Sequence, residues 1–276
     1  MERAAANCIL CNSSERSLLY RQEDWTVYCC DACGLGFLDP RPGVNELGDL
    51  YRYSYFDGQY GHGLKSRSPE MKKRLSQETH RIRFFRKIMR KGRILDIGCG
   101  MGYFLLACRD TGYDVEGMDI SDDSAVYVRG ELGIPVVVGT IDGINYPLES
   151  FDVITMWHFL EHTPDPRPYL QKARRWLKRD GMLVVDVPNY AGTDARKTWA
   201  LWKGWQLPYH LYHYTLYAGN LEEAPRESWI LHGSQQELPL GARQGEARAD
   251  AGSQTVRATD RPLLFGTQLR RRGEEG

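Results

Sequence analysis

Short, mostly apolar runs alternate with longer segments of helical periodicity through the middle of the chain. The runs are bounded by glycine, proline or polar residues and cover residues 93–97, 114–119, 135–138, 151–156 and 182–187. Runs of this length are typical of strands buried on both faces of a sheet. Because they alternate here with predicted helices, we expect right-handed crossovers and a doubly wound parallel sheet of the α/β class.

Three segments carry helix signals. Residues 70–90 have apolar side chains at helical spacing and a basic outer face, which we expect to be solvated, and Gly92 is expected to end this helix. Ser121 is expected to cap the helix after the second strand. Asp165 is expected to cap a later helix that has Pro166 at its first position.

The strongest chemical signal is a glycine-rich turn after the first buried strand. The sequence Asp-Ile-Gly-Cys-Gly-Met-Gly begins at Asp96, and the next strand ends at Asp119. Gly98, Gly100 and Gly102 allow the backbone to approach a ligand where a Cβ atom would clash. A buried carboxylate needs hydrogen bonds, so we expect Asp96 to hold the N–H groups of the turn. A nucleoside pocket is therefore predicted at the carboxyl end of the sheet, with Asp119 accepting both ribose hydroxyls.

The spacing of the glycines distinguishes two kinds of nucleoside site. A dinucleotide site has the pattern G-x-G-x-x-G, whereas Tyr103 stands here in place of its third glycine. The pattern hh-D-h-G-x-G-x-G instead resembles motif I of the class I S-adenosylmethionine (SAM) methyltransferases, and an NAD-dependent oxidoreductase remains an alternative. The resemblance implies a Rossmann-like fold and SAM as the cofactor. It also implies cofactor contacts from Asp96, Gly98, Cys99, Gly100, Gly102, Asp119, Ile120, Thr140, Ile141, Trp157 and His158.

A second part of the resemblance follows the fourth strand. Residues 157–166, Trp-His-Phe-Leu-Glu-His-Thr-Pro-Asp-Pro, are similar to the Glu-His-hydrophobic-Pro-Asp-Pro signature of that lineage. The resemblance places His162 near the methyl acceptor, where a near-neutral pKa suits it to take a proton; the alternative is that it braces the turn. His158, Glu161 and His162 also match positions at which small-RNA and quinone O-methyltransferases are thought to hold a divalent metal. Thr140 departs from the pattern, since the family usually has an acid there.

Aromatic residues are dense after the fifth strand. Residues 199–205 contain three tryptophans, and residues 208–215 read Pro-Tyr-His-Leu-Tyr-His-Tyr-Thr, a pattern that recurs in the methyltransferases that the chain resembles. This density suits a lid or an acceptor wall, or else the packing of an insertion. The candidate catalytic residues are therefore His162, His210 and His213.

Four of the seven cysteines form two C-x-x-C pairs. Cys8 and Cys11 are separated by 18 residues from Cys30 and Cys33, a spacing that predicts a zinc ribbon. Four thiolates close the coordination sphere, so this zinc would be structural and not catalytic. A cluster of reduced thiols is the alternative. A ribbon joined to a SAM domain resembles bacterial glycan- and natural-product-modifying methyltransferases.

Composition limits the partners and the compartment. The 276 residues carry 36 basic and 36 acidic side chains, so net charge gives no support to a nucleic-acid or anionic-membrane partner. Neither a signal peptide nor a membrane-spanning run is recognised, so a cytoplasmic protein is expected. The predicted parts are a zinc ribbon (1–45), an aromatic linker and helix (46–92), a SAM-binding domain (93–220) and an atypical tail (221–276).

The tail has no apolar periodicity, and we expect it to be disordered. The resemblance implies two further strands at the end of the sheet, but only the fragments Trp229-Ile-Leu231 and Leu263-Leu-Phe265 are present. The whole pattern predicts a SAM-dependent methyltransferase acting on an oxygen, nitrogen or carbon atom of a small metabolite or sugar. The alternative is a non-catalytic binding protein with an incomplete active site. The sequence specifies neither the acceptor nor the oligomeric state.

Overall fold

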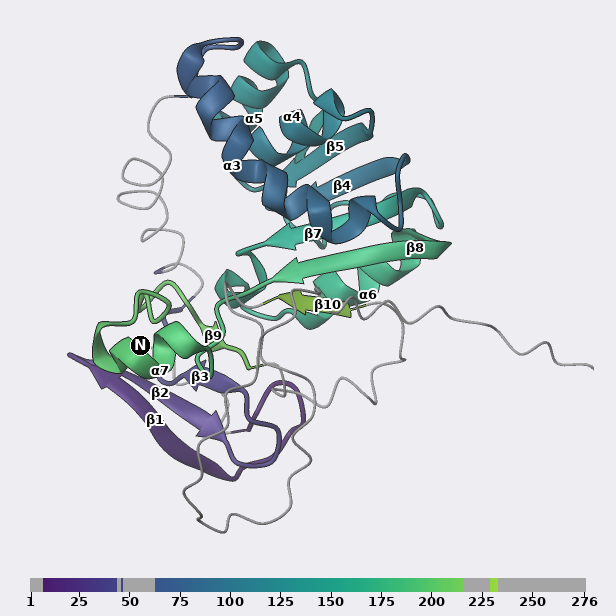
Figure 1. Ribbon diagram of the computed structural model, residues 1–276. Helices are drawn as coiled ribbons and strands as arrows, with labels where there is room; N and C mark the ends of the chain where they lie inside the picture. The colour runs from purple at the N-terminus through teal and green to yellow at the C-terminus, as the bar shows by residue number, and fades with distance from the viewer. Residues whose placement is uncertain (1–6, 44–45, 47–62, 216–228, 233–276) are drawn as a thin grey trace, which may run out of the picture.

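A computed structural model describes residues 7–43, 46, 63–215 and 229–232. These residues form two modules. A small antiparallel sheet lies at one end, and a larger parallel sheet with helices lies at the other (Figure 1). The tyrosine-rich stretch at residues 50–56 falls outside the described residues.

The larger module is a six-stranded parallel sheet with the strand order β10-β8-β7-β4-β5-β6. After β4 the chain continues outward through β5 and β6, and it then returns to the other side of β4 for β7 and β8. The order therefore reverses at β4, which is where ligands bind in doubly wound sheets. The predicted Rossmann-like fold is confirmed. The strands are β4 (Arg93–Ile97), β5 (Asp114–Asp119), β6 (Val136–Val138), β7 (Phe151–Trp157), β8 (Leu177–Asp186) and β10 (Trp229–His232).

Helices cover both faces of this sheet because alternate strand residues point to opposite sides. Ile94 joins a core with α3 and α4, whereas its neighbour Leu95 joins a second core with α6. In the first core, Phe85 is fully buried and meets the edge of Phe104 at a centroid distance of 6.3 Å. The helical elements are α3 (Pro69–Arg86), α4 (Tyr103–Asp110), α5 (Asp122–Tyr127), η2 (Val128–Leu132), η3 (Leu160–His162), α6 (Arg167–Trp176), α7 (Thr193–Thr198) and η4 (Trp199–Leu201).

The smaller module is an antiparallel sheet with the order β1-β2-β3-β9. Its first three strands are β1 (Arg16–Gln22), β2 (Trp25–Cys30) and β3 (Gly36–Leu38), whereas β9 (Tyr212–His213) comes from a distant part of the chain. The ring of Trp205 stacks on Tyr20 at 4.2 Å. The predicted boundary at residue 45 therefore separates the modules in sequence but not in space, because residues after the fifth strand of the parallel sheet complete the small one.

Several element boundaries differ from those predicted. The first helix ends at Arg86 and not at Gly92, whose φ of +148° instead lets the backbone approach Asp152. The later helix begins at Arg167, so Pro166 occupies the cap position and the Asp165 carboxylate accepts from the Arg167 amide at 2.9 Å. The strand β8 begins at residue 177, five residues earlier than expected, because a bulge lets Leu177 pair with Phe151. The Ser121 cap is confirmed by the 3.2 Å hydrogen bond from the Ser124 amide.

The segment Trp229–His232 corrects the expectation for the tail. It pairs in parallel with β8, with Trp229 opposite Leu183, so this fragment adds a strand beyond the fifth one. Residues 216–228 and 233–276 lie outside the described residues, as does the fragment at 263–265. None of the helices in the described part has both the length and the apolar character needed to span a bilayer.

Candidate active site

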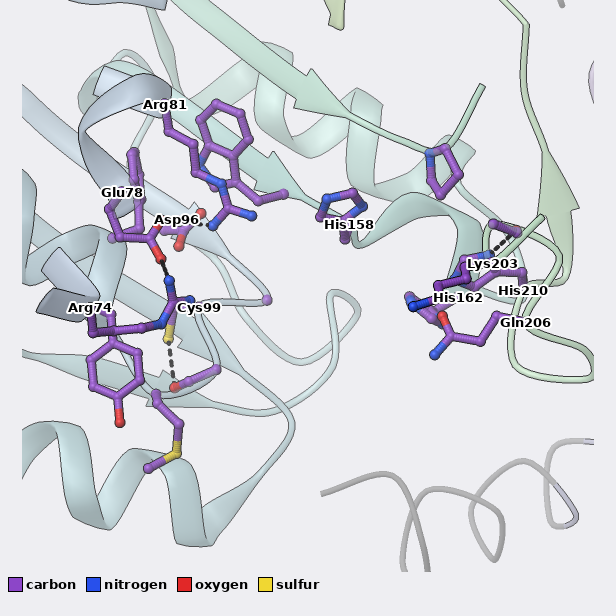
Figure 2. Close-up of a pocket in the computed structure, with 18 of the residues that line it drawn as sticks. Arg74, Glu78, Arg81, Asp96, Cys99, His158, His162, Lys203, Gln206 and His210 are labelled. Atoms are coloured by element: carbon purple, nitrogen blue, oxygen red, sulfur yellow. Dashed lines mark hydrogen bonds and ion pairs between the residues drawn. The ribbon is translucent and has the colours of Figure 1, made fainter. Parts of the chain in front are cut away.

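A cavity of about 620 Å³ opens at the carboxyl ends of β4 and β7, where the strand order reverses. Figure 2 shows the glycine turn and α3 on one side, the histidines His162 and His210 on the other, and His158 between them. The lining residues are Arg74, Glu78, Arg81, Asp96, Gly98, Cys99, Gly100, Met101, Gly102, Tyr103, Phe104, Trp157, His158, His162, Pro188, Asp194, Thr198, Leu201, Trp202, Lys203, Gly204, Gln206 and His210.

The glycine turn has the conformation that the sequence predicted. Gly98 and Gly102 have φ values of +78° and +68°, which residues with a side chain rarely adopt. A Cβ atom on Gly98 would lie 2.3 Å from the ring of Phe159. The amide of Gly98 donates to the Met118 carbonyl at 2.7 Å, which ties the turn to β5. The turn is therefore a backbone cradle that packs against Phe159, and a side chain at residue 98 would push the two apart.

Asp96 lies in the cavity wall but holds a different partner from the one predicted. It is 3% exposed, and the Thr155 hydroxyl donates to its Oδ1 at 2.6 Å. Burial raises the pKa of Asp96 to about 7, although the hydrogen bond from Thr155 opposes that rise. The amide of Gly100 in the turn is bonded by Asp119 instead. Asp96 thus couples β4 to β7, and Asp119 holds the turn.

Asp119 and three further predicted cofactor contacts do not line the cavity. Asp119 is 8% exposed, and its two oxygens accept from the amides of Ser121 at 2.9 Å and Gly100 at 2.7 Å. Burial raises its pKa despite these hydrogen bonds. Ile120 and Thr140 are exposed, and Ile141 is buried with its carbonyl bonded to a lysine. The contacts of these four residues with the cofactor stay predictions.

Three charged side chains of α3, which we expected to face solvent, line the cavity. Arg74, Glu78 and Arg81 come from one face of α3 and line the cavity, so the expectation of a solvated basic face is wrong for them. Glu78 is 1% exposed and is paired with Arg74 at 2.5 Å and Arg81 at 2.9 Å. The Arg81 guanidinium also lies 5.0 Å from the ring centroid of Trp157. Their spacing places the three on one helix face, which is the signal that could have identified them.

His162 and His210 face each other on the opposite side of the cavity, with ring centroids 4.6 Å apart. Nδ1 of His162 donates to the Tyr209 carbonyl at 3.1 Å, and Nδ1 of His210 donates to the Gly204 carbonyl at 2.8 Å. In a neutral imidazole this leaves the lone pair on Nε2. Burial lowers the pKa of both histidines to about 4, so both are neutral at pH 7.

A buried carboxylate lies beside these two histidines. Glu161 has no exposed surface, and among the described residues neither of its oxygens accepts a hydrogen bond. Donor atoms of Glu161, His162 and His210 all lie within 4.8 Å of one another. His158 lies 3.5 Å from Glu161, and although burial opposes it, the carboxylates of Glu161 and Asp186 raise the pKa of His158. His158 has φ +50°, a conformation that is uncommon outside glycine and often occurs at functional sites.

The aromatic segment contributes both to the cavity and to packing. Trp202 lines the cavity beside Lys203, whereas Trp205 is 1% exposed and lies between the modules. His213 is also 1% exposed, and its ring meets Trp205 at 5.1 Å. The structure therefore does not bring His213 to the cavity, in contrast to His162 and His210.

The four cysteines predicted as metal ligands come together at one end of the small module. Their sulfur atoms all lie within 4.8 Å of one another, and Sγ of Cys8 is 3.5 Å from that of Cys33. A tetrahedral zinc ion with Zn–S bonds of about 2.3 Å requires separations of about 3.8 Å, so this donor set fits the ion. Cys29 lies outside the group, and its sulfur contacts the Tyr190 hydroxyl at 3.5 Å.

Comparison with known proteins places this geometry in a family. A ubiquinone biosynthesis O-methyltransferase of Glaesserella parasuis serovar 5 (strain SH0165) is 31% identical over 107 residues, covering 35% of this chain and 45% of that protein. An uncharacterized methyltransferase of Bacillus subtilis (strain 168) is 31% identical over 108 residues, covering 37% and 42%. The chain thus spans less than half of these relatives. A SAM-dependent methyltransferase of known structure from Archaeoglobus fulgidus is 27% identical, with a TM-score of 0.36 and coverage of 43% and 53%.

A family model described as a methyltransferase domain matches residues 68–224, which include the helix α3, the glycine turn and the cavity histidines His158, His162 and His210. The matched segment covers more than half of the 276 residues. The chain therefore belongs to this family of methyltransferase domains.

Proposed function

We propose that the protein transfers a methyl group from SAM to a small metabolite or sugar. The observation that carries the proposal is the single cavity, which joins the glycine cradle after β4 to the neutral pair His162 and His210. One side of the cavity suits an adenosyl cofactor, and the other offers hydrogen-bond acceptors that can orient a methyl acceptor. SAM, when bound, supplies a methyl group on a positively charged sulfur, and the protein's main task is to align the reactants.

The cofactor side has groups for each part of SAM. Gly98, Gly100 and Gly102 line the cavity, so the ligand there meets backbone and no side chain of these residues. Asp119, which holds the Gly100 amide behind this turn, is the candidate acceptor for ribose hydroxyls. Arg81 supplies positive charge for the carboxylate of the methionine part. Because Glu78 neutralises part of this charge, the α3 face can also accommodate the amino group of the ligand.

The acceptor side is lined by His162, His210, Trp202, Lys203 and Gln206. Since both histidines are neutral and present Nε2 lone pairs, they can accept a hydrogen bond from an acceptor hydroxyl or amine and so orient it, whereas a pKa of about 4 makes them weak bases at pH 7. The indole ring and the polar groups beside it suit a small polar acceptor with a flat or ring-shaped part.

Glu161 gives specific support to a second assignment for the same side chains. A buried carboxylate without hydrogen bonds is costly unless a cation lies near it. His158 lies 3.5 Å away and offsets part of that cost, and a divalent ion would offset more of it. Glu161, His162 and His210 would hold a divalent ion, and the two Nδ1–H groups already donate to carbonyls, as those of metal-bound histidines do. The ion would polarise an acceptor hydroxyl. Transfer that is lost in EDTA and restored by Mg²⁺ or Mn²⁺ would favour this assignment over the imidazole base.

The cysteine cluster supports a structural zinc ion. Cys8, Cys11, Cys30 and Cys33 supply a closed set of four sulfur ligands. Zinc would fix the ends of the small sheet, since the second C-x-x-C pair overlaps the end of β2 and precedes β3.

The experiment that tests the proposal is incubation with methyl-labelled SAM and an extract of small metabolites. Labelling of a metabolite, together with SAM binding in calorimetry, is expected. SAM binding without any labelling would support the non-catalytic alternative. Absence of SAM binding at millimolar concentration would overturn the proposal.

A further inference from the structure

The small sheet and the acceptor histidines are joined by a short stretch of chain. Residues 209–211 lead directly into β9, which pairs with β3 through Tyr212 opposite Phe37. The Leu38 amide donates to the Leu211 carbonyl at 3.0 Å, which extends this pairing toward His210. His210 is thus two residues from a strand of the small sheet, while its side chain lines the cavity.

The same stretch also holds the other side of the histidine pair. The Tyr209 carbonyl accepts from Nδ1 of His162, and the Leu211 amide donates to the Glu161 carbonyl at 2.7 Å. The orientation of His162 is therefore set by backbone that is anchored in β9. A displacement of β9 would move both imidazoles relative to the cavity.

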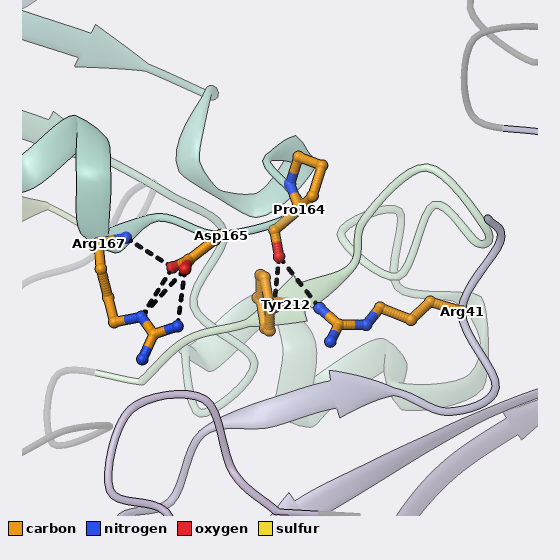
Figure 3. A network of polar contacts seen from close by, with 5 residues as sticks. All are labelled: Arg41, Pro164, Asp165, Arg167 and Tyr212. Carbon is orange, nitrogen blue, oxygen red and sulfur yellow. Dashed lines mark hydrogen bonds and ion pairs between the residues drawn. The ribbon is translucent and has the colours of Figure 1, made fainter. Parts of the chain in front are cut away.

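A second connection reaches the turn after η3, as Figure 3 shows. Arg41, which follows β3, donates to the Pro164 carbonyl at 3.1 Å and contacts the Tyr212 hydroxyl. The Tyr212 hydroxyl donates to the same carbonyl at 2.9 Å. Tyr212 is 2% exposed, so its hydroxyl is shielded from water, whereas the hydrogen bond from Arg41 to Pro164 is exposed. Pro164 is two residues beyond His162, so the network fixes the turn that carries that histidine.

In the described part of the chain, the cofactor side has no equivalent hydrogen-bonded connection. Within the described residues, no hydrogen bond joins residues 7–43 to the turn at 96–104. The turn is held by β5 through Met118 and Asp119. Among the described residues, the hydrogen bonds of the small module therefore reach the acceptor half of the cavity and not the glycine turn.

We propose that the small module, which carries the four clustered cysteines, positions the acceptor site. Arg41 and Tyr212 are the positioning residues that set the geometry of His162 and His210. The expected effect on the labelling rate rests on the proposed methyl transfer, whereas the expected effect on the histidine positions does not. The small module thus has a role in aligning the acceptor, distinct from cofactor binding.

The test compares Tyr212→Phe with Tyr20→Phe. Each variant removes one hydroxyl that bonds a carbonyl across the modules, but the Tyr20 hydroxyl donates to Ala200 at 3.0 Å, away from the histidine pair. The histidine ring signals of the labelled full-length protein are recorded by NMR. Tyr212→Phe is expected to shift the signals of His162 and His210 and to leave that of His80, on α3, unchanged, whereas Tyr20→Phe leaves all three unchanged.

Activity is measured with methyl-labelled SAM and the metabolite extract, and SAM affinity by calorimetry. Tyr212→Phe is expected to lower the rate of labelling roughly tenfold, because small misplacements of aligned groups are costly, with no change in SAM affinity or zinc content. Equal histidine spectra in the two tyrosine variants would overturn the inference. If the wild type neither binds SAM nor labels a metabolite, the proposed function fails, but the spectra still decide the positioning role.

Discussion

Gly98→Ala is the substitution that tests the cofactor cradle most directly. Gly98 has φ +78°, and the added Cβ atom would lie 2.3 Å from Cδ2 of Phe159. A left-handed conformation costs a residue with a side chain about 1–2 kcal/mol. Relief of the clash requires a movement of more than about 1 Å to reach ordinary carbon–carbon contact. Because the Phe159 ring is itself held edge-on to Tyr169 at 5.0 Å, we expect part of that movement to fall on the turn.

Gly112→Ala is the matched control. Gly112 also has a positive φ, +96°, but no atom lies within 4 Å of its Cβ position. Both variants should lose about 1–2 kcal/mol of unfolding free energy from backbone strain. Only Gly98→Ala should lose SAM affinity, by roughly 10- to 100-fold, which corresponds to about 1.4–2.8 kcal/mol.

Urea denaturation measures the strain, and calorimetric titration with SAM measures the affinity. The reasoning is refuted if the two alanine variants lose SAM affinity equally, since the effect would then follow stability and not the cradle. It is also refuted if Gly98→Ala binds SAM as tightly as the wild type, because the cofactor would then lie elsewhere.

Three further substitutions test other parts of the site. Burial raises the pKa of Asp96 to about 7, above the value of about 3.9 for an unfolded aspartate. The unfolding free energy of the wild type should therefore fall as pH rises from about 4 to about 7. Urea titrations of Asp96→Asn should lack that fall. Cys11→Ser should lose zinc and unfold at a lower temperature, whereas Cys29→Ser should retain the metal; elemental analysis and thermal scans decide this. Arg81→Gln should weaken SAM binding roughly tenfold and leave the binding of methylthioadenosine, which has no carboxylate, unchanged in calorimetry; equal weakening for both ligands would contradict the assigned contact.

The cofactor half of the site was predictable because its determinants are local in sequence. The strands β4 and β5 have the predicted bounds, since each is a short run between breaking residues. The turn between β4 and α4 has left-handed backbone, and glycine is the residue type that adopts this conformation most readily, so the glycines predict the turn. The partner of Asp96 was not predictable, because β7 supplies the hydroxyl of Thr155 from 59 residues away.

The acceptor half depends on contacts between distant segments. The sequence pattern of residues 208–215 treats His210 and His213 alike, but pairing of β9 with β3 buries His213 and leaves His210 at the cavity. The role of Arg74 and Arg81 depends on which face of α3 meets the sheet, a matter of tertiary packing. The strand Trp229–His232 is too short to show a period, and only its pairing with β8 reveals it.

The cofactor half and the acceptor half of the cavity are held by different hydrogen bonds, which bears on acceptor specificity. Among the described residues, no hydrogen bond joins the cradle at Gly98 to the small module, whereas His162 and His210 are held by backbone that leads into β9. Changes in β3, β9 or the segment between Trp202 and His210 can therefore reshape the acceptor side without disturbing the cofactor turn. In a fold of this kind the donor site can stay the same while the acceptor site varies, because different parts of the chain hold the two halves of the cavity.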